Sequence, residues 1–519
     1  MQRTRRVVAA LSAPLLAACL LVAASSSDSS IVASANQRRP NIVMVLTDDL
    51  STDLVRYMPH VQALQSAGMT FTNYTVTNSL CCPSRSSILT GRYPHNTGVF
   101  ANEGPNGGFG AFQMHGDDRL TFALALQRAG YRTAIMGKYL NGYSPGSASG
   151  YRSPTQVGWP GTPAPGGNYV APGWTTWAVA GKGYGEYDYN LNFNHRILHF
   201  GVAPHDYGVR TLDRLGRHFI TDSAAADKPF LLELSTFAPH PPYTPAYGDR
   251  DLFPSLRAPR TPAWNTTPSA APSWLAGHRP LTRPEISRID RAYRLRAEAV
   301  QSVDRAVGHL LDQLRTSGQL SNTVFMFTSD NGYHLGQYRM VAGKMSAFDT
   351  DIKVPLIVAG PGIPAGRVNG AVVESIDLAP TFEQLAGLPP APGRDGASLV
   401  GLLHGRKAAD WRTLALVEHH GQDFTQFPGD PDVEPGSERN IPSYNAMRSA
   451  QFTYVHYQNG QREYYDRTVD PYELDNIAGT LSAEQLSTLD EWLAALTNCH
   501  GAAECWAAGR AGQPLPATG

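Results

Sequence analysis

The chain has 519 residues, with 43 Lys plus Arg against 44 Asp plus Glu and a formal net charge of −1. This balance gives no electrostatic reason to expect nucleic acid or an acidic surface as a partner. The 49 Gly and 39 Pro are spread through the chain without a short repeat or a low-complexity tract, which argues against a solenoid, a coiled coil and a disordered chain. The length predicts one large domain, or a large domain with a smaller partner.

The N-terminus has the order of a secretion signal. Arg3, Arg5 and Arg6 precede the apolar run 7–24, and small residues follow it. No other apolar run is long enough to span a bilayer, so we expect no transmembrane partner. The sequence therefore predicts an exported protein, either extracellular or at the cell surface.

Three details leave the export route open. Arg5 and Arg6 before two valines form part of a twin-arginine signal, and residues 16–19 resemble a lipoprotein cleavage site that ends at Cys19. Apolar residues after Cys19 argue against lipidation. Residues 515–519 read Leu-Pro-Ala-Thr-Gly, which has the form of a sortase motif.

Four cysteines follow this leader. Cys499 and Cys505 are close in sequence, and we expect them to form a disulfide in an oxidising compartment. Cys81 and Cys82 are adjacent, so they are poorly placed to bond to each other. The adjacent pair therefore needs another explanation.

The central part of the chain alternates apolar strands with helices. Residues 41–47 form an unbroken apolar run, which is typical of a strand buried on both faces of a parallel sheet. The other predicted elements are helix 59–67, strand 69–76, helix 120–129, strand 131–136, helix 292–314, strands 323–328 and 354–358, and helix 377–386. The alternation indicates βαβ units, and hence an α/β fold with a large, mostly parallel sheet flanked by helices.

From about Ala408 the pattern changes. Shorter amphipathic strands are predicted at 414–418, 444–448, 452–457 and 463–466, with a final helix near 482–496. We interpret this part as a smaller C-terminal α+β subdomain with an antiparallel sheet. The predicted organisation is a signal peptide and leader over 1–35, the large domain over 36–407, and the subdomain and tail over 408–519.

Two stretches rich in Gly and Pro, 141–189 and 240–284, are too long for simple connections. Their tryptophans are Trp159, Trp174, Trp177, Trp264 and Trp274. These rings either form a pocket wall that stacks on a ring-shaped ligand or anchor the loops to the body of the protein. The sequence favours neither interpretation.

Two of the predicted buried strands end in polar pairs, Asp48-Asp49 and Asp330-Asn331. Because ligands bind beyond the carboxyl ends of parallel strands, we expect these side chains to meet at one edge of the sheet. Clustered carboxylates repel one another unless a cation lies among them, and an all-oxygen set favours Ca²⁺ or Mg²⁺ over zinc. One such pair alone would more simply cap a helix or form a turn, whereas two together favour a metal site.

The run from Cys81 to Gly91 begins where a strand gives way to a predicted helix, with Pro83 near its first position. Unpaired N–H groups at a helix N-terminus favour an anion, and Arg85 adds a bidentate donor. The run has the form Cys-x-Pro-Ser-Arg-x-x-x-Leu-Thr-Gly, which resembles the signature of the type I, formylglycine-dependent sulfatases. The resemblance implies an alkaline-phosphatase-like fold and conversion of Cys81 to formylglycine (3-oxoalanine) by a formylglycine-generating enzyme, with Cys82 at a variable position.

The resemblance extends from about Arg39 to Ala478. The motifs at 81–85, 137–141 and 331–334 are most similar to the N-acetylglucosamine-6-sulfatase branch of the family and its extracellular heparan relatives. This similarity implies a sulfuric ester hydrolase whose substrate is a sulfated aminosugar, a glycosaminoglycan-type glycan or an aryl sulfate.

The family also implies roles for individual residues. One Ca²⁺ ion would be bound by Asp48, Asp49, residue 81, Asp330 and Asn331, and the sulfate would be surrounded by Arg85, Lys138, His240 and Lys344. One hydroxyl of hydrated formylglycine would attack sulfur, and His240 or Lys344 would protonate the leaving alcohol. Loss of the proton from the second hydroxyl would then release sulfate.

One position departs from many sulfatases. Leu140 stands where they have a His that contacts formylglycine, a replacement that the aminosugar branch shares. The group that assists formylglycine therefore stays open. His95 and His334 lie within the motifs, and each either reaches the pocket or forms hydrogen bonds within its loop.

Two other functions stay open at this point. One is a phosphoester or phosphonate monoester hydrolase on the same fold, because an anion pocket alone does not separate sulfur from phosphorus. The other is a glycan-binding protein in which Cys81 is unmodified and inert.

Overall fold

The computed structural model describes residues 38–146, 168–389, 391–405, 411–421 and 441–511. Residues 39–519 belong to one compact unit. The predicted signal sequence with Cys19, Trp159, the subdomain boundary at 407 and the motif at 515–519 lie outside the described residues. In the described ranges, every helix is too short or too polar to cross a bilayer.

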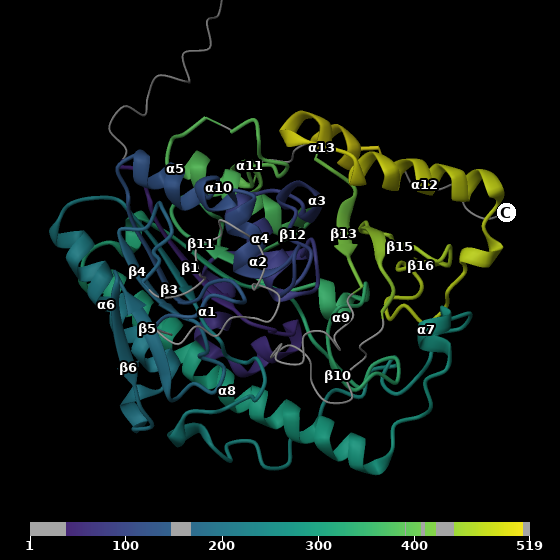
Figure 1. Cartoon of the computed structure of the whole chain (residues 1–519), viewed down its shortest axis with the longest axis horizontal. Coiled ribbons are helices and arrows are strands. Elements are labelled where there is room, and N and C mark those ends of the chain that lie inside the picture. Colours follow the sequence, from purple (N-terminus) through teal and green to yellow (C-terminus); the bar gives the residue numbers. More distant parts are fainter. Residues whose placement is uncertain (1–37, 147–167, 390, 406–410, 422–440, 512–519) are drawn as a thin grey trace, which may run out of the picture. The chain divides into compact units, whose positions relative to one another are not determined.

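A ten-stranded sheet forms the centre of this unit, in the order β12-β2-β11-β8-β1-β7-β3-β4-β5-β6 (Figure 1). Its strands are β1 (Asn41–Thr47), β2 (Met69–Thr75), β3 (Arg132–Lys138), β4 (Thr176–Ala180), β5 (Tyr189–Phe193), β6 (Arg196–Phe200), β7 (Phe230–Ser235), β8 (Thr323–Ser329), β11 (Leu356–Ala359) and β12 (Arg367–Glu374). Strand β1 is parallel to both neighbours, β7 and β8, whereas β5 and β11 run antiparallel to theirs. The predicted large, mostly parallel sheet is confirmed.

Helices cover both faces of the sheet. Alternate residues of β1 belong to different hydrophobic cores, Ile42 and Met44 to one and Val43 and Val45 to the other, because successive side chains of a strand point to opposite sides. The first core also takes side chains from α2 (Cys81–Thr90), α4 (Gly108–Met114), α5 (Phe122–Arg128) and α10 (Leu378–Leu385). The second core takes them from α1 (Pro59–Ala67), α6 (Gly208–Ala225) and α8 (Arg283–Thr316).

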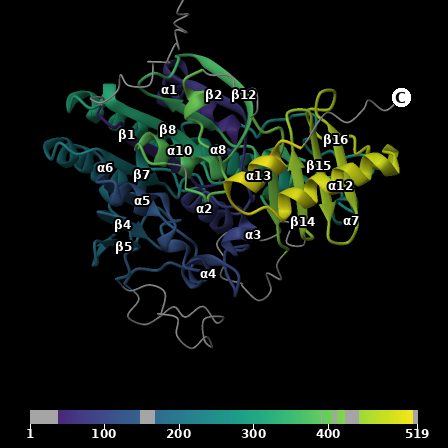
Figure 2. The ribbon, with the colours of Figure 1, turned by 90° about the horizontal axis from the view of Figure 1, so that it is seen from above.

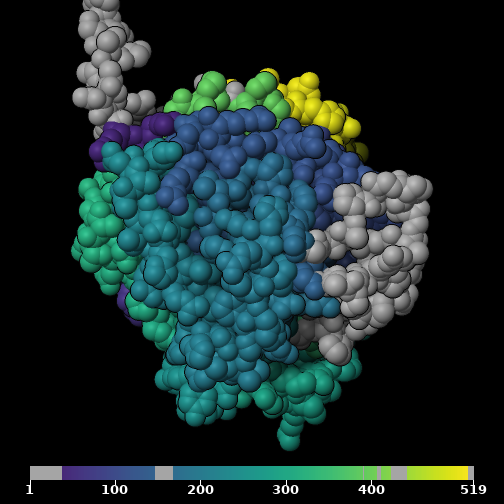
Figure 3. Space-filling view, turned by 60° about the vertical axis from the view of Figure 1, so that its left-hand side comes forward, coloured from purple at the N-terminus to yellow at the C-terminus, as the bar shows by residue number. Residues whose placement is uncertain are grey.

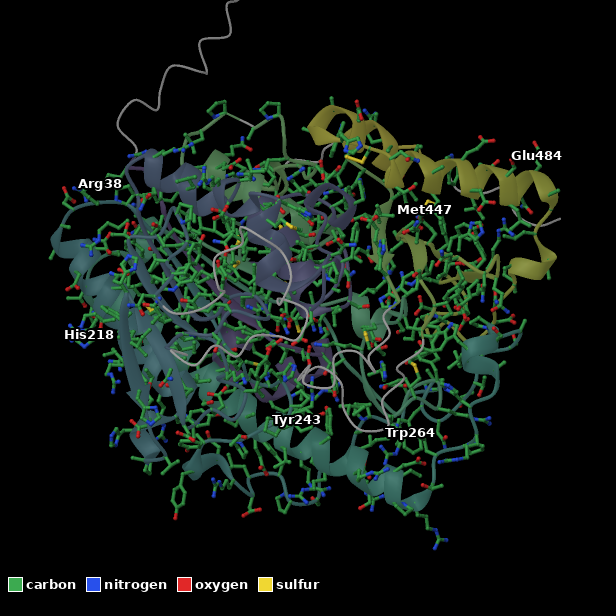
Figure 4. The ribbon with its side chains drawn as sticks, viewed as in Figure 1. Arg38, His218, Tyr243, Trp264, Met447 and Glu484 are labelled. Carbon is green, nitrogen blue, oxygen red and sulfur yellow. A yellow bond between two sulfur atoms is a disulfide. The ribbon has the colours of Figure 1, made fainter. Side chains whose placement is uncertain are left out.

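The C-terminal region contains a separate antiparallel sheet in the order β13-β14-β15-β16. Its strands are β13 (Ala415–His419), β14 (Tyr444–Arg448), β15 (Phe452–Tyr457) and β16 (Arg462–Asp466), and helices α12 (Ala483–Thr497) and α13 (Gly501–Gly509) lie beside them (Figure 2). Met447 of β14 and Glu484 of α12 mark this part in Figure 4. Cys499 and Cys505 form a disulfide, so both the predicted antiparallel sheet and the predicted disulfide are confirmed.

Apart from 3-10 turns, the remaining helices and strands of the described chain are short. They are α3 (Pro94–Thr97), α7 (Ser273–Ala276), α9 (Asp349–Ile352), α11 (Val400–Leu403), β9 (His334–Leu335) and β10 (Ala342–Gly343). The last two strands pair as an antiparallel hairpin.

Several elements were not predicted. The apolar sequence of strand β7 is interrupted by Glu233, which is buried in the sheet. Strands β5 and β6 are short and partly polar. Helix α8 begins nine residues before the predicted start, at Arg283 instead of 292, because Thr282 and Glu285 cap it: the Thr282 N–H donates to the Glu285 carboxylate over 2.8 Å. Local capping therefore extends this helix beyond its apolar pattern.

Three of the four described tryptophans from the long loops pack against other parts of the protein. Trp177 is fully buried, and its indole N–H donates to the Tyr143 hydroxyl over 3.0 Å. Trp174 packs edge-on against Phe122. The Arg260 guanidinium lies 3.8 Å from the ring centre of Trp264, which Figure 4 labels. The anchoring interpretation therefore holds for these three rings.

Candidate active site

The two polar pairs, Asp48-Asp49 and Asp330-Asn331, lie side by side at one edge of the sheet. Thr47 at the end of β1 pairs with Ser329 at the end of β8, so the residues that follow them emerge at the same edge. The Asp49 N–H donates to Asp330 over 3.1 Å, and the Asn331 amide donates to Asp49 over 2.6 Å. The structure thus brings Asp48, Asp49, Asp330 and Asn331 together, all fully buried.

Cys81, the first residue of α2, faces this cluster. Its Sγ lies 3.3 Å from Oδ1 of Asp48, 3.8 Å from Oδ1 of Asp49 and 2.7 Å from Nζ of Lys344. Helix α2 is fixed against β8 because the Ser84 hydroxyl donates to the carbonyl of Asp330 over 2.5 Å. Residue 81 therefore lies at the N-terminal end of α2, where the helix dipole favours negative charge.

Three buried cations neutralise the carboxylates. Arg85 donates to Asp330 over 2.7 Å, Lys138 at the end of β3 donates to Asp48 over 2.7 Å, and Lys344 donates to Asp49 over 2.7 Å. Burial acts to lower the pKa of Arg85, but the charges of Asp330 and Asp48 outweigh it and raise that pKa above its ordinary value. Each of the three carboxylates therefore has a buried cationic partner within the site.

His240 approaches the cluster from the loop after β7. Its Nε2 lies 3.7 Å from Oδ2 of Asp49, and its Nδ1 lies 2.7 Å from the Pro241 carbonyl. Because a carbonyl can only accept, Nδ1 carries a proton and Nε2 is the atom directed at Asp49.

The sequence did not indicate two residues at the site, the aromatic Tyr184 and the basic Arg296. Tyr184 lies with its ring centre 4.6 Å from that of His240 and 5.1 Å from Nζ of Lys138. The only sequence feature that marks Tyr184 is the Gly-rich run 181–185 around it. Glycine is needed at position 183 because a Cβ there would lie 2.4 Å from the ring of Phe237. Arg296 of α8 is fully buried and donates to the backbone carbonyl of Asp49 over 2.5 Å, and nothing in its helical pattern marked it.

The donor set can hold a metal ion. One ligand atom from each of Asp48, Asp49, Cys81 and His240 lies within 4.8 Å of the others. Oδ2 of Asp49 and Oδ1 of Asn331 are buried and make no hydrogen bond. Buried oxygens without hydrogen bonds are costly, and a cation would satisfy them.

His334 forms hydrogen bonds within its own loop region. Its Nδ1 lies 2.9 Å from the Asp351 carboxylate, which also accepts from the Ser346 hydroxyl over 2.6 Å. His334 pairs with Gly343 in the β9–β10 hairpin, directly before Lys344. The residue therefore braces the segment that carries Lys344. Leu140, at the departing position, is buried in the first core.

His95 is directed at the C-terminal region. Its Nδ1 lies 2.8 Å from the Glu418 carboxylate, and its Nε2 lies 2.9 Å from the carbonyl of Cys499. Burial acts to lower the pKa of His95, but Glu418 outweighs it and raises that pKa above the ordinary 6.5. His95 thus links helix α3 to β13 and to the disulfide segment.

We expect His95→Gln to destabilise the protein by about 1 kcal/mol at pH 6 and by less at pH 8.5. A raised folded-state pKa gives stability that is fully present below the unfolded pKa and is lost as pH rises through the folded value. Urea unfolding midpoints at the two pH values measure this difference. His205→Gln, at a side chain that is 77% exposed, is the control, and an equal deficit at both pH values would contradict the role of the charged pair.

A cavity of about 470 Å³ lies against the C-terminal sheet. Its polar lining includes His420, Asn445, His456 and Gln458. The Tyr444 hydroxyl, also at this cavity, donates to the carbonyl of Met345 over 3.0 Å. One lining residue of the cavity is therefore bonded to the segment that carries Lys344.

Comparisons with known proteins agree with this fold and site. Residues 40–388 match the Sulfatase family model, and residues 336–498 match the model described as N-sulphoglucosamine sulphohydrolase, C-terminal. The chain belongs to the sulfatase family, whose members are sulfuric ester hydrolases. It is 33% identical over 494 residues to the N-acetylglucosamine-6-sulfatase of Homo sapiens, an alignment that covers 90% of this chain and 86% of the human protein.

Solved structures share the fold. The structure of BT4656 in complex with its substrate D-glucosamine-2-N,6-O-disulfate superposes with a TM-score of 0.71 at 22% identity, covering 88% of this chain and 97% of that one. The phosphonate monoester hydrolase SpPMH from Silicibacter pomeroyi superposes with a TM-score of 0.66 at 20% identity, covering 88% and 94%. At these identities the likeness establishes the architecture, and the predicted alkaline-phosphatase-like fold is confirmed.

Proposed function

We propose that this protein is an exported, calcium-dependent sulfatase that removes sulfate from an aminosugar or glycosaminoglycan-type glycan. The observation that carries the proposal is the position of Cys81, whose Sγ lies 3.3 Å from Oδ1 of Asp48 and 2.7 Å from Nζ of Lys344 in a buried site of paired charges. The similarity to human N-acetylglucosamine-6-sulfatase over nearly the whole chain supports an aminosugar substrate. The Cys499–Cys505 disulfide supports export to an oxidising compartment.

The residues present fit a hard divalent cation. Asp48, Asp49, Asp330 and Asn331 offer carboxylate and amide oxygens, which are the ligands that Ca²⁺ prefers. The two buried oxygens without hydrogen bonds, on Asp49 and Asn331, supply a physical reason for a cation at this site. When bound, calcium would add positive charge that attracts the sulfate ester and stabilises an anionic oxygen on residue 81.

We also propose that Cys81 is converted to formylglycine. When hydrated, this group would supply a geminal diol: one hydroxyl would act as the nucleophile at sulfur, and loss of the other hydroxyl's proton would re-form the aldehyde as the C–O bond to sulfate breaks, without attack by water at sulfur. A serine or cysteine in its place would form a stable sulfate ester or a thiosulfate, respectively, which would still have to be hydrolysed.

The chain's own side chains then orient the ester and move protons. Arg85, fixed by Asp330 and by the Ser235 hydroxyl at 3.1 Å, and Lys138, fixed by Asp48, are placed to hold sulfate oxygens. Lys344, which touches residue 81, and Nε2 of His240 are the two groups that can give a proton to the leaving alcohol. Because each carboxylate already has a buried cationic partner, a bound divalent cation would leave a net positive pocket for an anionic ester.

The cavity at the C-terminal sheet is the proposed saccharide pocket. Its volume of about 470 Å³ suits a sugar ring, and its His, Asn and Gln side chains can both donate to and accept from hydroxyl groups. Its lining residue Tyr444 donates to the carbonyl of Met345, next to Lys344, so a sugar held there would extend away from the reacting sulfate.

The test is sulfate release by calcium-loaded protein that has been coexpressed with a formylglycine-generating enzyme. We expect a higher kcat/KM for N-acetylglucosamine 6-sulfate and 6-sulfated oligosaccharides than for a simple aryl sulfate, and least turnover of an aryl phosphate. Turnover of the aryl sulfate alone would overturn the proposal that the substrate is a glycan. Preference for the aryl phosphate would favour a phosphoester hydrolase, and no turnover despite a confirmed aldehyde would overturn the proposal.

A further inference from the structure

A second charged feature lies between helices α6 and α8, outside the active site. A groove of about 370 Å³ is lined there by His205, Arg210, Arg214, Arg217, Arg305 and His309 among other residues. Figure 3 shows the face to which α6 belongs, with the residues of β4 to α6 coloured blue to teal. Since the whole chain has a net charge of only −1, this concentration of arginines is a local property of the fold.

The arginines share one face of α6 because of their spacing. Arg210 and Arg214 are four residues apart, and Arg214 and Arg217 three, so their side chains are neighbours on the helix surface. Like charges at this spacing disfavour a helix. The cluster therefore carries a cost that an anion bound in the groove would relieve.

Carboxylates compensate only part of this charge. Asp213 pairs with Arg217 over 3.0 Å and with His309 over 2.9 Å, and Asp249 pairs with Arg305 over 2.5 Å. Within the described ranges, neither Arg210 nor Arg214 takes part in an ion pair, and both are exposed. Two exposed arginines thus line the groove without a carboxylate partner, although the Arg210 guanidinium donates to the carbonyl of Pro204 over 3.2 Å.

An exposed aromatic ring adjoins the basic side chains. Tyr247 is 68% exposed, and the Arg250 guanidinium lies 5.5 Å from its ring centre. Tyr247 and Asp249 form one short helical turn, and Asp249 binds Arg305 of the groove. An aromatic face beside arginines is suited to a ligand that has both apolar ring faces and anionic groups.

The loop that carries His240 connects this face to the active site. From His240 it passes Tyr243, labelled in Figure 4, and reaches Tyr247 seven residues later, so the two ends are at most roughly 25 Å apart. A second loop runs from Tyr184, beside His240, to Tyr187, whose pKa is raised by burial while the charges of Arg250 and Arg210 act to lower it. A ligand of several sugar units could therefore contact both places.

We propose that the α6/α8 groove, with Tyr247, is a second binding site for a sulfated saccharide segment, remote from the sulfate that is hydrolysed. This inference rests on the proposed sulfatase function and adds that the natural substrate is a polyanionic glycan chain instead of a single sugar. Arg210 and Arg214 bind sulfate groups bidentately, and Tyr247 stacks on a sugar ring. The groove raises the affinity for the chain and leaves the chemistry at residue 81 unchanged.

The test uses the double variant Arg210→Glu/Arg214→Glu. Its control is Arg128→Glu/Arg367→Glu, which makes the same charge change at exposed positions on α5 and β12. We expect KM for a sulfated heparan-type oligosaccharide to rise about tenfold in the groove variant at low salt, with kcat/KM for N-acetylglucosamine 6-sulfate unchanged. The control should leave both substrates within about twofold.

Direct binding separates this inference from the proposed function. The unconvertible Cys81→Ala protein should bind the oligosaccharide in calorimetry, and the groove variant in that background should bind it about tenfold more weakly. Equal binding by the two proteins would overturn the groove site even if the enzyme is a sulfatase. A single-stranded oligonucleotide of equal charge that binds as tightly through the same arginines would overturn the saccharide assignment. Failure to hydrolyse any sulfate ester, with groove-dependent binding intact, would instead count against the proposed function.

Discussion

Cys81→Ala is expected to lower sulfate ester hydrolysis by at least about 10⁴-fold, the scale on which removal of a catalytic nucleophile acts. Alanine cannot be converted to formylglycine, so the site would keep its cations and carboxylates but lose the group that attacks sulfur. Binding of the ester should change much less than turnover, because Arg85, Lys138 and Lys344 remain in place. Single-turnover kinetics with a chromogenic aryl sulfate measures the loss.

Cys82→Ala is the matched control. Cys82 is the neighbouring buried thiol, and burial raises its pKa to about 12, so it stays protonated and unreactive. We expect this variant to lose about 1 kcal/mol of stability from the core and to keep its kcat within about threefold. Peptide mass analysis of residues 57–85 should show conversion at position 81 in this control. Full activity of Cys81→Ala, or loss of conversion with retained turnover, would contradict formylglycine chemistry.

The second large effect is expected from Asp49→Asn. Asp49 contacts Lys344, Asn331 and His240, so its charge lies at the centre of the proposed calcium site. Removal of one carboxylate should weaken Ca²⁺ binding on the order of 100-fold, and activity at micromolar calcium should fall accordingly. Isothermal titration of chelated protein with Ca²⁺ measures the affinity without requiring turnover.

Backbone strain does not confound this test. Asp49 has φ 63°, in the left-handed region, where asparagine is well tolerated. Asp188 has φ 53° and is exposed, so Asp188→Asn makes the same substitution in a similar backbone conformation away from the site. Unchanged calcium affinity in Asp49→Asn, or an equal loss in Asp188→Asn, would show that the carboxylate of Asp49 is not a ligand.

The local pattern of the chain was sufficient to predict the core strands and the fold class. Strand β1 was predicted with its observed bounds because an unbroken apolar run is what burial on both faces requires. Strands β14 and β15 were also predicted with their observed bounds. Strand β7 was missed because Glu233, in its middle, breaks the apolar run; Ser235 donates to that carboxylate over 3.2 Å.

The acidic pairs and the run from Cys81 could be singled out because each is contiguous in sequence. Tyr184 and Arg296 could not be found in this way. Each acts through partners far along the chain: Tyr184 stacks on His240, and Arg296 binds the carbonyl of Asp49. Such contacts depend on how loops and a helix pack, which no local pattern specifies.

By itself, the sequence determined the mostly parallel α/β fold, the C-terminal antiparallel sheet, the disulfide and the sulfatase family, because these follow from periodicity, cysteine spacing and contiguous motifs. Only the tertiary structure decided that His95 links α3 to the C-terminal region, that His334 braces the Lys344 hairpin, and that Trp177 lies in the core. It also decided that arginines of α6 and α8 share one groove. The physical reason is that a side chain's partners are set by the packing of distant segments, whereas its local conformation is set by its neighbours in the chain.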